Sequence, residues 1–93
     1  MIDIEAIIIN AKETLERGLP EEALKILDNH PIENSCEVLF LKGEIYFKLQ
    51  RWGDALNQFS GFLEKSPSDN RAESYCLMIQ NILGFYHKDL YNP

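Results

Sequence analysis

Hydrophobic residues recur at intervals of three and four along the chain, and glycine and proline interrupt the pattern. Over residues 3–17 the recurring apolar positions are Ile4, Ile7, Ile8, Ala11 and Leu15. These positions share one face of a helix because a turn contains about 3.6 residues. Gly18 ends this first helix. No segment has the two-residue alternation of a half-buried strand over a useful length, so the pattern predicts an all-α fold.

Four further helices are predicted at about residues 19–27, 34–49, 52–63 and 71–83. Pro20 lies in the first turn of the earliest of them, where a missing N–H costs nothing. Asn34 followed by Glu37 fits a capping arrangement at the start of the next one. Trp52 begins the fourth predicted helix, and we expect it to pack in or near the core. The turns are short, so successive helices are expected to be antiparallel neighbours.

The chain also repeats itself at an offset of 32 residues, since residues 18–27 align with residues 50–59. The alignment matches an Ala-Leu pair and the apolar residue four positions after the alanine. Residues 34–67 resemble the tetratricopeptide repeat, a helix–turn–helix unit of about 34 residues. The resemblance is carried, at the separations of the family pattern, by Gly43, Tyr46, Ala55, Phe59 and Pro67. Leu39 and Lys42 depart from the pattern, which has tryptophan and leucine at those positions.

This resemblance implies a short right-handed α-α solenoid of antiparallel helix hairpins, with five helices in a single domain spanning residues 1–93. Residues 1–33 would form a degenerate repeat (best matched over 2–31), residues 34–68 a good repeat, and residues 69–93 a capping helix and tail. Gly43 and Ala55 would mark a close approach of two helices, with Tyr46 and Phe59 filling the space beside them. The residues of the first repeat expected to pack in the same way are Ala23 and Leu27. We also expect Phe85 and Tyr86 of the tail to pack against the preceding helices.

The resemblance further implies a concave groove lined by the first helix of each pair. The groove positions carried over from the family are Ile8, Lys12, Phe40, Glu44, Phe47, Lys48, Met78 and Asn81, together with Glu5, Leu15, Glu16, Glu37, Leu41 and Ser74. Phe40 and Phe47 lie two turns apart on one face, and either contact a ligand or belong to the core between repeats. Some family members bind a terminal carboxylate with basic and amide side chains at these positions. With Ile8 and Phe40 there, and acids in excess, we expect no such clamp.

Charge and composition narrow the partner. Fifteen acidic and nine basic residues give the 93-residue chain a net charge of −6, and no two basic residues are adjacent. This pattern disfavours nucleic acid and anionic membrane surfaces, which are bound by clustered lysine and arginine. No apolar stretch approaches the roughly 18 residues of a membrane span, and two acids occupy the first five positions, where a secretory signal would be basic. Cys36 and Cys76 are expected to be buried thiols. Together these features predict a cytoplasmic protein.

Candidate catalytic groups are sparse. His30 and His87 have no further ligand at metal-binding spacing, and the isolated glycines do not form a phosphate loop. We therefore expect no enzymatic activity, no cofactor and no metal. The predicted function is that of a scaffold-like protein–protein interaction module, which binds a peptide or protein partner with basic residues beside apolar anchors. The alternative is an assembly module that forms a homodimer through its exposed end helices, since about three stacked repeats are needed for stability.

Overall fold

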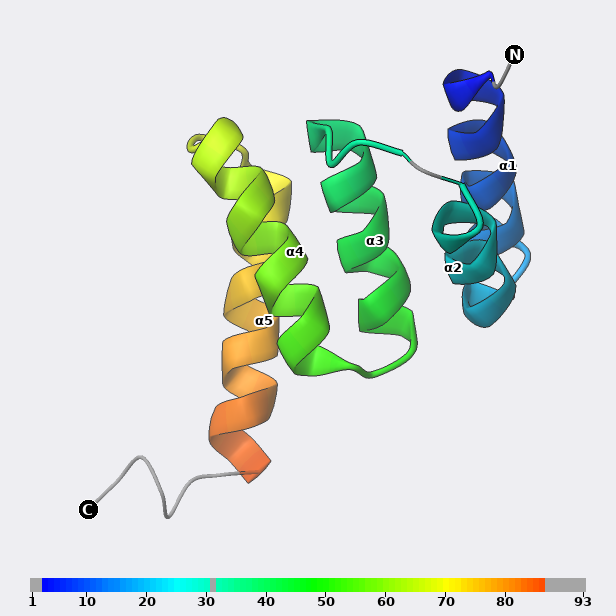
Figure 1. The fold of residues 1–93 in the computed structure, drawn as a ribbon. Helices are drawn as coiled ribbons and strands as arrows, with labels where there is room; N and C mark the ends of the chain where they lie inside the picture. Colours follow the sequence, from blue (N-terminus) through cyan, green and yellow to red (C-terminus); the bar gives the residue numbers. More distant parts are fainter. Residues whose placement is uncertain (1–2, 31, 87–93) are drawn as a thin grey trace.

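The computed structural model of the chain describes residues 3–30 and 32–86 and, at Phe85 and Tyr86, the backbone alone. Over these residues the fold is all-helical and contains no strand (Figure 1), which confirms the predicted fold class and the five helices. The helices are α1 (Ile4–Glu16), α2 (Pro20–Asp28), α3 (Cys36–Lys48), α4 (Trp52–Lys65) and α5 (Asn70–Tyr86). The last helix is three residues longer than predicted. The predicted packing of the side chains of Phe85 and Tyr86 lies outside the described residues.

Short polar side chains begin three of the helices. The carboxylate of Asp3 accepts a hydrogen bond from the backbone N–H of Ala6 at 3.2 Å. At the start of α3, the hydroxyl of Ser35 accepts one from the N–H of Val38 at 3.3 Å. The predicted pairing of Asn34 with Glu37 is therefore replaced by a cap one residue later. Asp69 serves α5 in the same way, because its Oδ1 accepts from the N–H of Ala72 at 3.3 Å.

The α1–α2 and α3–α4 turns have the same backbone geometry. Gly18 has a φ of +81° and Gln50 a φ of +60°, so each helix ends on a residue in the left-handed region. The N–H of Leu19 donates to the carbonyl of Thr14 at 3.2 Å, and the N–H of Arg51 donates to the carbonyl of Tyr46 at 2.9 Å. Both are Schellman motifs, and their matching residues are 32 positions apart. The turn thus repeats at the offset found in the sequence.

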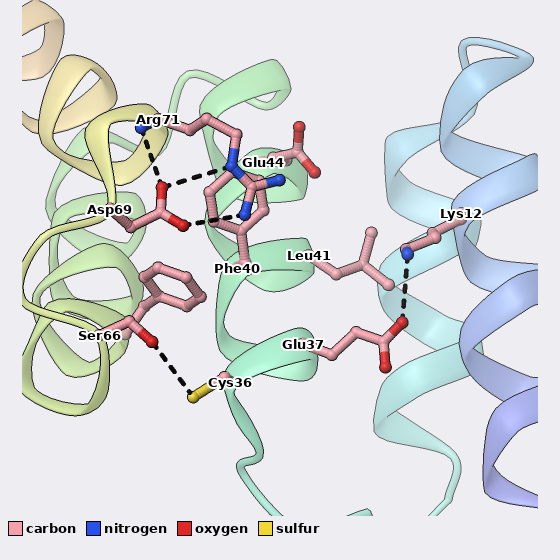
Figure 2. A pocket seen from close by; sticks show the side chains of 10 residues that line it. Lys12, Cys36, Glu37, Phe40, Leu41, Glu44, Ser66, Asp69 and Arg71 are labelled. Atoms are coloured by element: carbon pink, nitrogen blue, oxygen red, sulfur yellow. Dashed lines mark hydrogen bonds and ion pairs between the residues drawn. The ribbon is translucent and has the colours of Figure 1, made fainter.

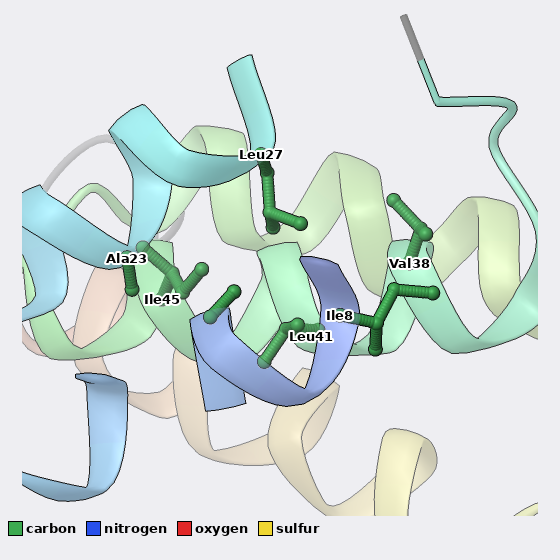
Figure 3. Close-up of a cluster of buried hydrophobic side chains, with 7 residues drawn as sticks. Ile8, Ala23, Leu27, Val38, Leu41 and Ile45 are labelled. Atoms are coloured by element: carbon green, nitrogen blue, oxygen red, sulfur yellow. The ribbon is translucent and has the colours of Figure 1, made fainter. Parts of the chain in front are cut away.

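Two hydrophobic clusters form the core, and α3 contributes to both. The first cluster is built by Ile8, Ala11, Ala23, Leu27, Val38, Leu41 and Ile45 of α1, α2 and α3 (Figure 3). The second joins α3 to α4 and α5, and its buried members are Leu39, Ala55, Phe59, Phe62, Ala72 and Ile79. In Figure 1, α3 lies between the α1–α2 pair and the α4–α5 pair. Opposite faces of α3 are therefore covered by different helices, as expected for a helix that is apolar on more than one face.

Gly43 is the point of closest approach between α3 and α4. A Cβ atom at this position would lie 2.7 Å from Cε1 and Cζ of Phe59, whose side chain is completely buried. The corresponding residues of the first repeat, 32 positions earlier, are Ala11 and Leu27, and both are buried. The larger residue on the first helix is therefore matched by a smaller one on the second, so each pair fills its space.

Candidate ligand groove

Polar contacts connect α1 and α5 to the same side of α3. Lys12 Nζ on α1 lies 3.2 Å from Glu37 Oε1 on α3. On the other side, the hydroxyl of Tyr75 on α5 donates to Glu44 Oε2 of α3 at 3.2 Å. Glu37 and Glu44 lie two turns apart on α3. The surface between α1 and α5 is therefore bridged by side chains at both of its edges.

A depression of about 410 Å³ lies at the N-terminal end of this surface (Figure 2). Its walls come from α1, α3, the end of α4 and the α4–α5 turn, and they include Lys12, Glu37, Phe40, Glu44 and Arg71. The wall thus combines an aromatic ring with charges of both signs. Phe40 supplies most of the apolar character, and the charged groups surround it.

Phe40 is held by aromatic rings from α4 and α5. Its centroid lies 5.2 Å from that of Phe62, 5.5 Å from that of Phe59 and 5.9 Å from that of Tyr75, all in edge-to-face arrangements. The guanidinium carbon of Arg71 lies 4.5 Å from the centroid of Phe40, a cation–π distance. Phe40 is half-buried, so it belongs to the second hydrophobic cluster and also lines the depression.

Arg71 is fixed in position by Asp69. Its Nη2 donates to Asp69 Oδ2 at 3.0 Å and its Nε to Asp69 Oδ1 at 3.3 Å. These hydrogen bonds, with smaller contributions from the backbone N–H groups of Ala72 and Arg71, hold the pKa of Asp69 below its ordinary value. One carboxylate thus caps α5 and orients the guanidinium over Phe40.

A second depression, of about 580 Å³, lies toward the C-terminal end of α3. Its walls include Leu15 and Glu16 of α1, Glu44 and Lys48 of α3, and Tyr75 of α5. Glu44 also lines the first depression, so the two meet at this side chain. Together they form a continuous groove, called here the α1–α3–α5 groove.

Tyr75 forms part of the floor of the groove. Its ring stacks on Phe59 with a centroid separation of 4.6 Å and an interplanar angle of 8°, and it lies 5.0 Å from the ring of Phe47. Burial raises the pKa of the Tyr75 hydroxyl, and the neighbouring carboxylate of Glu44 raises it further, through its charge and as the hydrogen-bond acceptor. The hydroxyl therefore remains protonated and able to donate to Glu44.

Three of the eight predicted partner-binding residues line the groove as charged, accessible groups: Lys12, Glu44 and Lys48. Ile8 does not, because it is only 4% exposed and packs in the first hydrophobic cluster. Phe47 also packs internally, with its centroid 5.2 Å from that of the half-buried Trp52. For Phe47 the core alternative is therefore correct, and Trp52 packs as expected.

Met78 and Asn81 are exposed on α5 but line neither depression. Among the predicted repeat-packing residues, Gly43, Ala55, Phe59, Ala23 and Leu27 are buried and Tyr46 is half-buried. Pro67 differs, because it lies exposed in the turn between α4 and α5. Its position after the C-terminal residue of α4 prevents that helix from continuing.

Arg71, Tyr75 and Asp69 were missed by the sequence analysis. The signal for Arg71 was present, because it follows Glu37 by one repeat length of 34 residues. Tyr75 and Asp69 carried no comparable signal. Their roles depend on the packing of α5 against α3 and on the turn before α5, which the periodicity does not specify.

The remaining reactive groups are isolated. Cys36 and Cys76 are free and half-buried, and burial raises the pKa of the Cys76 thiol, with a smaller contribution from Glu73. His30 Nδ1 lies 2.8 Å from the carbonyl oxygen of Ile26. Within residues 3–30 and 32–86, no three His, Cys, Asp or Glu side chains are grouped closely enough to hold a metal ion. In the same ranges, every helix is too short or too polar to cross a membrane.

Comparison of the chain with protein-family models, curated proteins and solved structures found no match.

Proposed function

We propose that this protein is a small interaction module of the tetratricopeptide type, which binds an extended peptide or a segment of a partner protein in the α1–α3–α5 groove. In this proposal α1–α2 and α3–α4 are successive antiparallel hairpins of a right-handed solenoid, and α5 caps the second. The observation that carries the proposal is the groove itself. Its walls come mainly from the first, third and fifth helices, as a solenoid of helix pairs requires.

Two features of the core support the repeat arrangement. The Schellman turns at Gly18 and Gln50 are 32 residues apart and have matching hydrogen bonds. The close contact of Gly43 with Phe59 corresponds to the buried pair of Ala11 and Leu27 at the same offset. Repetition of both the turn and the helix contact is expected when one structural unit occurs twice.

The groove is suited to binding rather than to chemistry. It combines a half-buried aromatic ring, Phe40, with charged groups that are held in place by hydrogen bonds. Binding sites of this kind obtain affinity from apolar contacts and specificity from a few oriented polar groups. A peptide in an extended conformation could contact both depressions while passing over Glu44.

Site-specific photo-crosslinking in cells of the source organism tests the groove. A photoreactive amino acid placed at Lys48 should form adducts with a partner. The same amino acid at the exposed residues Lys25 of α2 and Lys65 of α4, which line neither depression, should not. Mass spectrometry of the adducts identifies the partner. Adducts that form equally at all three positions, or only at Lys25 and Lys65, contradict the groove assignment.

The exposed apolar residues of α5 favour a second candidate function, self-assembly. Leu77 is 57% exposed and Met78 45% exposed, on a helix that the chain covers on one side. In a longer solenoid the next helix would cover such a face. Sedimentation from micromolar to near-millimolar concentration decides between the states. A dimer that Leu77→Lys converts to monomer supports assembly through α5, whereas a monomer at all concentrations excludes it.

A further inference from the structure

Glu44 differs from the other acidic residues of the groove in its partners. Glu37 is paired with Lys12 at 3.2 Å, and Asp69 is paired with Arg71 at 3.0 Å. Within the described residues, the hydrogen-bond partner of Glu44 is a neutral group, the phenol of Tyr75, and no cation lies within 4.0 Å of its carboxylate. Glu44 is thus a carboxylate without an ionic partner at the point where the two depressions meet.

The position of Glu44 makes this arrangement costly without a ligand. Its side chain is half-buried beside the rings of Phe40 and Tyr75, where a charge loses part of its hydration. One oxygen accepts from Tyr75, which leaves the other free to accept further hydrogen bonds. Lys48 lies one turn further along α3 and Arg71 lies across the first depression, but neither forms an ion pair with it in the described chain. A cation brought by a ligand would complete the site.

Acidic groups continue along the groove beyond Glu44. The second depression adds Glu16, and it shares Gly18 and Pro20 with a third depression of about 290 Å³ at the start of α2. Glu21 and Glu22 line this third depression, so the path from Glu44 to α2 contains four carboxylates and one basic residue, Lys48. The other end of the groove is dominated by Phe40. The groove therefore has an apolar end and an acidic end, with Glu44 between them.

We propose that the ligand is an extended peptide that presents an arginine or lysine side chain to Glu44 and an adjacent apolar side chain to Phe40. This inference rests on the proposed groove function and assigns the chemistry of its ligand. The cation would accept the charge of Glu44 and would also lie near the face of an aromatic ring, a combination that favours guanidinium groups. The acidic residues toward α2 give the peptide a direction, with its basic end on the α2 side.

The probe is a random dodecapeptide display library, selected on the full-length protein and on Glu44→Gln. A selected peptide is then synthesised with arginine and with citrulline, its neutral analogue, at the conserved basic position. We expect wild-type protein to prefer the arginine peptide by about tenfold, because a charged hydrogen-bonded pair is lost in citrulline. In Glu44→Gln the two peptides should bind within about twofold of each other. The control is Glu64→Gln, an exposed glutamate of α4 outside the groove, which should behave as wild type.

The outcomes separate this inference from the proposed function. If selected peptides shift the backbone amides of α1, α3 and α5 but show no preference for basic residues, the inference is wrong and groove binding stands. The inference also fails if Glu44→Gln still distinguishes arginine from citrulline by tenfold. If no peptide is selected, or if selected peptides shift only amides outside the groove, both the inference and the groove function are contradicted.

Discussion

At the scale of single residues, Gly43 sets the distance between α3 and α4. Replacing it by alanine places a methyl group 2.7 Å from the Phe59 ring. That ring is completely buried and stacked on Tyr75, so it has little freedom to move. We expect Gly43→Ala to lower the free energy of unfolding by about 1–3 kcal/mol, as overpacked core substitutions do. Urea denaturation followed by circular dichroism measures the change.

Two further variants show whether this loss has the proposed cause. Gly61→Ala on α4 places its methyl group at an ordinary 3.6 Å from Leu39, so it should be neutral or stabilising through helix propensity. Adding Phe59→Leu to Gly43→Ala recreates the Ala11 and Leu27 pair of the first repeat. The double variant should be more stable than the sum of the two single effects predicts. Strict additivity would mean that the contact with Phe59 is not the source of the loss.

The candidate site could be predicted from the sequence only in part, and Ile8, Lys12 and Phe47 show why. The repeat register places all three on the groove side of a helix. Neighbouring positions on a helix face differ in burial by how closely the next helix approaches, which periodicity leaves undetermined. Ile8 and Phe47 are covered by neighbouring helices, whereas Lys12 remains accessible and pairs with Glu37.

At the scale of elements, the matched turns after α1 and α3 differ in one residue. Gly18 adopts a positive φ without steric cost, whereas Gln50 at a φ of +60° does not. The strain of a left-handed residue is about 1–2 kcal/mol, and the added freedom of glycine in the unfolded chain offsets part of it. We therefore expect Gln50→Gly to stabilise the protein by about 0.5–1 kcal/mol, seen as a higher urea midpoint at constant slope. Gly18→Gln is the reverse control and should destabilise.

Protonation of Asp69 should loosen the start of α5. Because the pKa of Asp69 is lowered by its hydrogen bonds to Arg71 and to the first N–H groups of α5, the ionised form stabilises the folded state. This contribution is present above the pKa of the unfolded chain and is lost as the pH falls through the lower pKa of the folded state. Carbon-13 NMR of the carboxyl group should show this lowered pKa. Arg71→Gln should raise it toward the ordinary value, and an unchanged pKa in that variant would contradict the assigned cause.

The order and extent of the helices could be predicted closely because local signals specify them. Gly18 and Pro20 separate α1 from α2, and the apolar spacing defines the interior of each helix. The exact cap of α3 could not be predicted, since Asn34 and Ser35 are both favourable capping residues and their geometry decides between them. In the fold, Ser35 caps the helix and Glu37 is used for an ion pair with α1.

At the scale of the whole molecule, α3 joins two cores that otherwise share no helix. Val38, Leu41 and Ile45 face α1 and α2, while Leu39 packs with α4 and α5. Each core is small, so neither pair of outer helices is stabilised without α3. The end helices α1 and α5 have one side covered and one side exposed, which includes the exposed residue Leu77.

This arrangement predicts a gradient of local stability that hydrogen exchange can measure. Amide protons in the centre of α3 should exchange only through global unfolding, because exposing them breaks both cores. Amide protons in α1 and in the C-terminal half of α5 should exchange through local opening, with lower free energies that respond little to mild denaturant. Leu41→Ala, which weakens the first core, should accelerate exchange in α1 and α2 more than in α5. Equal protection across the five helices would instead indicate that the molecule opens as a single unit and that α3 has no special role.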